Sequence, residues 1–154
     1  MNKFAIILGE PNSINSEILA KSIAYKKQCI IIGSYDLLEK QFKKLKVKIK
    51  LNKKNITFKK KSIKSLNVLD VPLKFKNPFK VPSRVSSSYL KRCFQIAHQL
   101  ALSRKIKGFI NCPVDKKKLF KNKNLGVTEF LSLKNNLKNK SVMMIFNEKL
   151  SVVP

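Results

Sequence analysis

Short apolar runs alternate with segments of helical spacing in the first part of the chain. The runs at residues 3–8 and 28–33 have the length and composition of buried strands. Each is followed by a turn and an amphipathic segment. We predict one helix from residue 15 or 16 to about Lys26 and another from Tyr35 to Leu45. Strand–helix repeats with short turns favour an α/β fold, with a mainly parallel sheet flanked by helices.

The middle of the chain has a weaker pattern. Residues 46–66 alternate apolar residues with lysine and then become lysine-rich, which predicts an edge ribbon or loose loops. A short strand at 67–71 and a proline-punctuated, non-helical connection follow. The serines at 86–88 are candidate caps for a helix that runs to about Lys105. The single histidine, His98, falls in this helix without a second ligand at metal-binding spacing, so we expect it at the helix surface or boundary.

The next pattern is a short apolar run, Gly108–Ile110, of the kind that forms a buried strand. The chain then turns at Asn111–Pro113, and Pro113 suits the first position of a helix that would bury Val114, Leu119 and Phe120. Three lysines follow Asp115 near the start of this predicted helix. Cations oppose the positive end of a helix dipole, so their position suggests an anion bound between them.

A second polar turn, Gly126–Glu129, precedes a predicted helix from Phe130 to about Asn136. Residues 141–146 and 150–153 then read as two strands of a hairpin joined by a turn at 147–149. Polar turns that follow buried elements commonly build the site of an α/β fold.

Length and composition set the class of protein. A chain of 154 residues that is 44% hydrophobic is long enough for one globular domain, residues 1–154. No apolar run approaches the length of a membrane span, and the run before Gly9 is too short for a signal peptide. Three cysteines without paired spacing indicate neither a disulfide framework nor a zinc ribbon, so we expect a cytoplasmic protein.

The net charge of +26 raises the hypothesis of nucleic-acid binding. Only three of the 34 basic residues are arginine, the residue favoured for bidentate phosphate and base contacts. The lysines are also spread along the whole chain. We therefore do not expect nucleic acid as the partner, and a basic nucleic-acid or ribosome-associated protein stays the second hypothesis. That hypothesis predicts salt-sensitive RNA binding.

The eight acidic residues are scarce enough to be informative. Half of them lie in three polar turns: Glu10, Glu17, Asp115 and Glu129. These turns are therefore the candidate site, and we expect the bends near positions 10, 113 and 128 to meet at one edge of the sheet.

The same turns carry a resemblance to a known family. Asn111–Lys116 followed by Gly126–Glu129 resembles the Thr-x-Pro-Ile/Val-x-Lys and Gly-His-Thr-Glu turns of the 4-hydroxythreonine-4-phosphate dehydrogenase family of vitamin B6 biosynthesis. Gly9–Ile18 is similar to that family's Gly-Asp/Glu-Pro-Ala-Gly-Ile-Gly-Pro-Glu turn. Met143–Met144 and Leu150–Val152 fall at two of its strands. The resemblance spans the chain and roughly the first half of such an enzyme.

The resemblance implies a two-domain dehydrogenase related to the isocitrate and isopropylmalate dehydrogenases, working as a homodimer. Such an enzyme oxidises the hydroxyl of 4-phosphooxy-threonine, a small phosphorylated amino acid. Its implied cofactors are NAD and a divalent metal (zinc, magnesium or cobalt). A related acid-sugar phosphate dehydrogenase is a further alternative that these residues do not distinguish.

Four residues are implied as substrate contacts. Thr128 matches the family's substrate-binding threonine, and Lys116 and Glu129 are weaker candidates. Val127 occupies the position of the family's histidine, and its side chain has no hydrogen-bonding atom. Ser13, Asn15 and Ser16 also depart from the family's Gly, Gly and Pro. No residue is assigned to catalysis or to NAD.

The family's three metal-binding histidines fall beyond the matched residues, as do later substrate contacts. The resemblance therefore implies that the metal ligands are absent from this chain and that its activity alone is doubtful. We expect a fragment with the C-terminal part absent, one half of a split enzyme, or a degenerate copy.

Overall fold

The computed structural model describes residues 4–22, 29–54, 65–120, 126–137 and 141–153. The chain divides into two compact units, residues 1–115 and 116–154. The expectation of one domain over 1–154 stays a prediction.

The first unit is built on a five-stranded sheet of strand order β3-β4-β2-β1-β5, in which every neighbouring pair is parallel. The α/β fold with a parallel sheet, predicted from the alternating runs, is confirmed. The strands are β1 Phe4–Ile7, β2 Cys29–Gly33, β3 Lys50–Lys54, β4 Ser65–Asp70 and β5 Gly108–Asn111.

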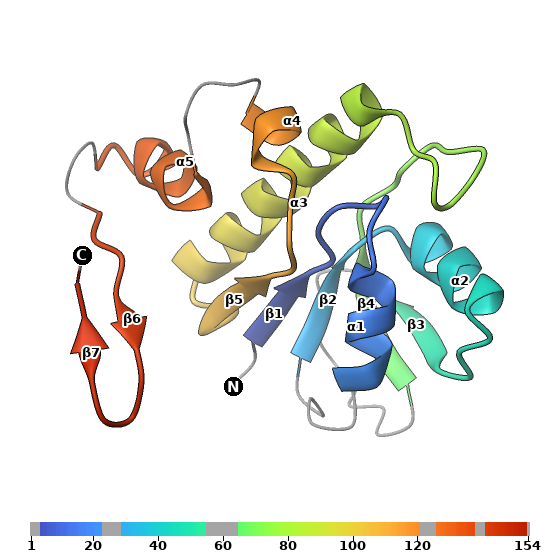
Figure 1. Ribbon diagram of the computed structural model, residues 1–154, viewed down its shortest axis with the longest axis horizontal. Coiled ribbons are helices and arrows are strands. Elements are labelled where there is room, and N and C mark those ends of the chain that lie inside the picture. Colours follow the sequence, from blue (N-terminus) through green and yellow to red (C-terminus); the bar gives the residue numbers. More distant parts are fainter. Residues whose placement is uncertain (1–3, 23–28, 55–64, 121–125, 138–140, 154) are drawn as a thin grey trace. The chain divides into compact units, whose positions relative to one another are not determined.

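Helices cover both faces of this sheet (Figure 1). They are α1 Asn15–Ser22, α2 Tyr35–Lys44 and α3 Ser83–Leu102. Parallel strands need right-handed crossovers. The connections through α1 and α2 run one way along the sheet and the connection through α3 runs back, so α3 lies on the opposite face. The core lies between these layers and includes Ile31, Leu38 and Phe94, each at most 1% exposed.

The predicted boundaries of α1, β1 and β2 extend past what the structure describes, because Lys3, Lys26 and Gln28 lie outside the described residues. Of the predicted edge segment 46–66, residues 55–64 lie outside the described residues, and Lys50–Lys54 form the edge strand β3. This strand pairs in parallel with β4 instead of forming a ribbon or loose loops. The next strand begins at Ser65, two residues before the predicted start, because Ser65 and Leu66 pair with β3.

Helix α3 begins at Ser83, so the prediction that serines 86–88 cap it is wrong. Pro82 holds the N-cap position, and its carbonyl accepts the N–H groups of Val85 and Ser86 at 3.0 Å. Ser86 is instead buried inside the helix, 2% exposed. His98 is half-buried in this helix.

Strand β5 was predicted to be buried, and this is wrong, because it lies at the edge of the sheet and Ile110 is 53% exposed. Pro113 was predicted as the first residue of a helix, and this is also wrong, since α4 runs from Lys116 to Phe120. Val114, expected to be buried in that helix, precedes α4 and is half-buried. A helix starting at Pro113 would need that residue's carbonyl for its own ladder. In the structure this carbonyl instead accepts the Glu10 N–H and the Asn15 side-chain amide.

The second unit contains α4, α5 (Val127–Lys134) and a two-stranded antiparallel sheet of β6 (Ile145–Phe146) and β7 (Ser151–Val152). Leu119 and Phe120 are buried, as predicted, and the rings of Phe120 and Phe130 lie 5.5 Å apart. The hairpin is confirmed, with shorter strands than predicted. Its turn is closed by the Asn147 N–H, which donates to the Leu150 carbonyl at 2.9 Å.

Candidate functional site

The candidate site of the first unit lies where the order of the sheet reverses. From β1 the chain proceeds to β2 and outward, then returns through α3 to place β5 on the other side of β1. In α/β proteins, ligands bind outside the carboxyl ends of the strands at such a switch point. The two segments at this position are the loop 8–14 after β1 and the connection 112–115 after β5.

Hydrogen bonds join these two segments directly. The Cys112 N–H donates to the Ile7 carbonyl at 3.0 Å, which extends the β1–β5 pairing by one residue. The Pro113 carbonyl accepts the Glu10 N–H at 3.1 Å and the Asn15 side-chain amide at 2.9 Å. The predicted bends near positions 10 and 113 therefore lie together at the carboxyl edge of the sheet.

Gly9 makes this close approach possible. Its φ is +76°, in the left-handed region that disfavours residues with a Cβ. A Cβ at this position would lie 2.7 Å from the Pro113 carbonyl oxygen and 2.9 Å from Cβ of Cys112, and would also meet the Asn15 amide. The loop geometry therefore requires glycine here.

The Glu10 carboxylate fastens the loop to α3. Its Oε1 accepts the Ser86 hydroxyl at 2.7 Å, and the Glu10 carbonyl accepts the Ser13 hydroxyl at 2.6 Å. Glu17 has a different role, because it forms an exposed ion pair with Lys21 one turn along α1, at 2.7 Å. Exposed pairs of this kind contribute little to stability.

Two side-chain amides fix the rest of the loop. Asn12 makes a two-way pair with the backbone of Val81, donating at 2.8 Å and accepting at 2.7 Å. The buried Gln41 donates to the carbonyls of Pro11 and Pro78, each at 2.8 Å. Loop 8–14 is therefore pre-organised by contacts with segments far away in the sequence.

Unused polar atoms remain beside this loop. Asn15 and Ser16 are each 2% exposed, and Asn15 Oδ1 and Ser16 Oγ are buried with no hydrogen-bond partner in the described protein. Buried polar groups normally have partners. The start of α1 therefore offers one acceptor and one hydroxyl that a polar ligand or water could satisfy.

The predicted substrate contacts lie in the second unit. Lys116 is the first residue of α4 and is exposed. Val127, Thr128 and Glu129 form the first turn of α5, where the sequence pattern had predicted a turn preceding the helix. Thr128 and Glu129 are exposed and Val127 is half-buried. Convergence of the bend near 128 with the other two stays a prediction.

Gly126 is the N-cap of α5, with extended backbone and no side-chain cap. A Cβ at Gly126 would collide with the Glu129 carboxylate, which shows that this acid folds back over the start of its own helix. An acid in the first turn complements the helix dipole. Glu129 therefore has a local structural role in addition to any contact with substrate.

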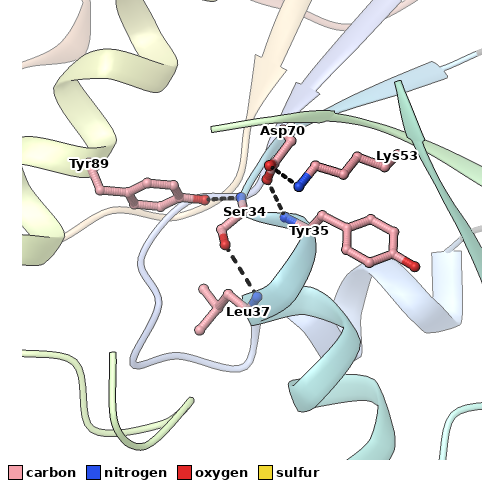
Figure 2. A network of polar contacts seen from close by, with 6 residues as sticks. All are labelled: Ser34, Tyr35, Leu37, Lys53, Asp70 and Tyr89. Carbon is pink, nitrogen blue, oxygen red and sulfur yellow. Dashed lines mark hydrogen bonds and ion pairs between the residues drawn. The ribbon is translucent and has the colours of Figure 1, made fainter. Parts of the chain in front are cut away.

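Sequence reasoning missed a second polar network at the carboxyl ends of β2 and β4 (Figure 2). Asp70 accepts the Tyr35 N–H at 2.9 Å and pairs with Lys53 at 2.7 Å, a hydrogen bond that raises the pKa of Lys53. Ser34 caps α2 through the Leu37 N–H, and its own N–H donates to the Tyr89 hydroxyl at 2.9 Å. A serine before an amphipathic segment is a cap signal that could have been used.

Cys93 and Tyr89 lie one turn apart in α3, and both are fully buried. Burial raises the pKa of the Cys93 thiol from 9.0 to about 12 and raises the pKa of Tyr89 well above its usual range. Cys93 is therefore a structural thiol rather than a candidate nucleophile.

We expect Cys93 to resist alkylation in the native protein. The raised pKa of the Cys93 thiol lowers the fraction of thiolate at neutral pH, and burial blocks the reagent as well. Iodoacetamide labelling followed by peptide mass spectrometry should modify the half-buried Cys29 and Cys112 first, and Cys93 only after unfolding in urea. Equal labelling rates for all three in the native protein would contradict this burial.

The metal implied by the family does not fit the residues present. The sequence contains one histidine, and within the described part of the chain no three His, Cys, Asp or Glu side chains gather as a metal site. No chemical step is therefore assigned to a metal here.

Among the described helices, none is long and apolar enough to cross a membrane.

Comparisons with known proteins agree with this geometry. Three solved structures match the chain over 99% of its length: a 4-hydroxythreonine-4-phosphate dehydrogenase from Burkholderia phymatum (TM-score 0.80, 20% identity), a putative one from Salmonella typhimurium (0.82, 22%), and one from Klebsiella pneumoniae (0.78, 20%). The chain covers 49%, 50% and 50% of those chains, respectively, so it spans about half their length. At sequence identities of 20% and 22%, this structural similarity establishes the fold of the chain alone.

A search of curated proteins found no match to this sequence. The model of one protein family, the pyridoxal phosphate biosynthetic protein PdxA, matches residues 25–154. This match covers most of the chain, including the connection after β5 and the first turn of α5. The chain therefore belongs to the PdxA family of pyridoxal phosphate biosynthetic proteins.

Proposed function

We propose that this chain provides part of the substrate site of an NAD-dependent 4-hydroxythreonine-4-phosphate dehydrogenase. The observation that carries the proposal is the junction of loop 8–14 with the connection 112–115 at the switch point of the sheet. The family match supports the reaction class. We further propose that the working enzyme is a cytoplasmic homodimer.

In this proposal the residues of the chain bind and orient, and they do not complete the reaction. Thr128 offers an exposed hydroxyl to the substrate, and Lys116 offers a cation for its phosphate or carboxylate. Val127 offers no hydrogen bond, so binding is weaker than in a protein with histidine there. NAD would accept the hydride when bound. The metal-binding histidines would have to come from outside these 154 residues.

The first test is catalysis by the purified chain. With NAD, a divalent metal and 4-phosphooxy-threonine, we expect no NADH formation above the background without protein. The physical reason is that three histidine ligands are required by the proposal and this sequence contains one. Robust NADH formation by the chain alone would contradict the proposal.

The second test is binding, which separates loss of catalysis from loss of the site. In an NMR titration, the phosphorylated substrate should shift the amide signals of residues 111–116 and 126–129. Replacing Thr128 by valine should reduce the affinity about fivefold, because one typical hydrogen bond contributes about 1 kcal/mol. Lys134→Gln, at the other end of α5, is the matched control. Shifts confined to other parts of the chain would reject this assignment.

A further inference from the structure

A cavity lined by lysine side chains lies in the first unit. It has a volume of about 420 Å³, and its lining comprises four lysines with Asn77 and Pro78: Lys40, Lys43, Lys44 and Lys76. Among the residues that the structure describes, no carboxylate lines it. The larger cavity beside β3 differs, because Glu39 contributes to its wall alongside lysines. The concentration of one charge sign therefore distinguishes this cavity.

Two walls form the cavity. Lys40, Lys43 and Lys44 come from the second half of α2, and Lys76 and Asn77 come from the connection between β4 and α3. Gln41, 2% exposed, ties the walls together because its amide donates to the Pro78 carbonyl at 2.8 Å. The Asn77 side chain in turn accepts the Phe79 N–H at 3.0 Å. The walls are therefore held by hydrogen bonds inside the protein.

The helix dipole of α2 accounts for only two of the four lysines that line the cavity. Lys43 and Lys44 lie in the last turn of α2, where cations complement the helix dipole. Lys40 lies a turn earlier and Lys76 lies on the other wall, so the dipole does not explain them. The Lys40 ammonium is positioned 5.1 Å above the Phe75 ring, which orients it by a cation–π contact.

Four like charges around one cavity repel each other, and a bound anion would relieve that repulsion. We propose that this cavity binds a compact polyphosphate, such as the phosphate chain of a nucleotide or an inorganic polyphosphate. Compactness follows from the arrangement, because the lysines come from two walls of one cavity instead of following a strip. Lysine also suits this role, since it binds phosphate as a point charge without bidentate geometry.

The test compares two charge-matched double variants by calorimetric titration with tripolyphosphate at low salt. Lys40→Gln with Lys76→Gln removes one lysine from each wall and leaves the two lysines that cap α2. Lys105→Gln with Lys107→Gln removes two exposed charges after α3. We expect the cavity variant to weaken tripolyphosphate binding about tenfold, from two lost ion pairs of up to fivefold each. The control should change it less than twofold.

Several outcomes would overturn the proposal. Equal weakening in both variants would mean that net charge alone attracts the anion. Absence of tripolyphosphate binding by the native chain would reject the site, provided that circular dichroism shows a folded protein. Tighter binding of single-stranded RNA, equally affected by both variants, would indicate an extended backbone ligand. Parallel titrations with ATP and tripolyphosphate distinguish the phosphate chain of a nucleotide from inorganic polyphosphate as the preferred ligand. None of these readouts depends on dehydrogenase activity.

Discussion

Replacing Gly9 by alanine is expected to lower the free energy of unfolding of the first unit by about 3 kcal/mol. Two costs add at this position. The left-handed backbone, with φ of +76°, is unfavourable for any residue with a Cβ. The added methyl group would also lie 2.7 Å from the Pro113 carbonyl oxygen, so one of the two joined segments must move.

Urea unfolding measures this effect, with tyrosine fluorescence as the probe. The sequence has three tyrosines and no tryptophan, and all three tyrosines lie within residues 1–115, so the signal reports on the first unit. Gly108→Ala is the matched control, because a Cβ there meets only the Phe4 ring at 3.8 Å, an ordinary contact. If both variants lost the same stability, the close approach at Gly9 would be disproved.

Phe94→Ala should be more damaging, with an expected loss of about 4 kcal/mol. Phe94 is 0% exposed in α3, the helix that covers strands β1, β2 and β5. Truncation removes a large apolar side chain and leaves a cavity that the packed layers can fill only in part.

The control for this variant is Phe146→Ala in β6, where the side chain is 70% exposed. We expect it to change stability by less than about 0.5 kcal/mol, because an exposed side chain gives up little contact on truncation. The same tyrosine signal serves for Phe94, and thermal unfolding by circular dichroism serves for Phe146. A Phe94 variant as stable as the native chain would mean that α3 does not pack on the sheet.

Stretches dominated by local pattern could be predicted well from the sequence. The apolar runs 3–8 and 28–33 and the helical spacing of Tyr35–Leu45 agree with β1, β2 and α2 within a residue or two over the described part. Hydrophobic periodicity directly reports which side of an element is buried. The family resemblance also came from short local motifs, because most residues of the turns at 111–116 and 126–129 match the family's types, with Val127 as a departure.

Predictions failed where a distant residue decides the local structure. Pro113 was expected to begin a helix, but loop 8–14 uses its carbonyl. Gly108–Ile110 was expected to be buried, and an apolar run does not reveal that its strand lies at the edge of a sheet. Asp70 and Tyr89 were overlooked because their partners, Tyr35 and Ser34, are 35 and 55 residues away.

The amino-acid sequence by itself determined the fold class, the family and the chemical character of each turn, since these depend on residue type and short-range spacing. The tertiary structure alone decided the strand order, the junction of Gly9 and Glu10 with Pro113, and the gathering of Lys40 and Lys76 around one cavity. The physical reason is that hydrogen bonds and charge interactions depend on the separation of atoms in space. The local periodicity of the chain does not encode that separation for residues far apart in the sequence.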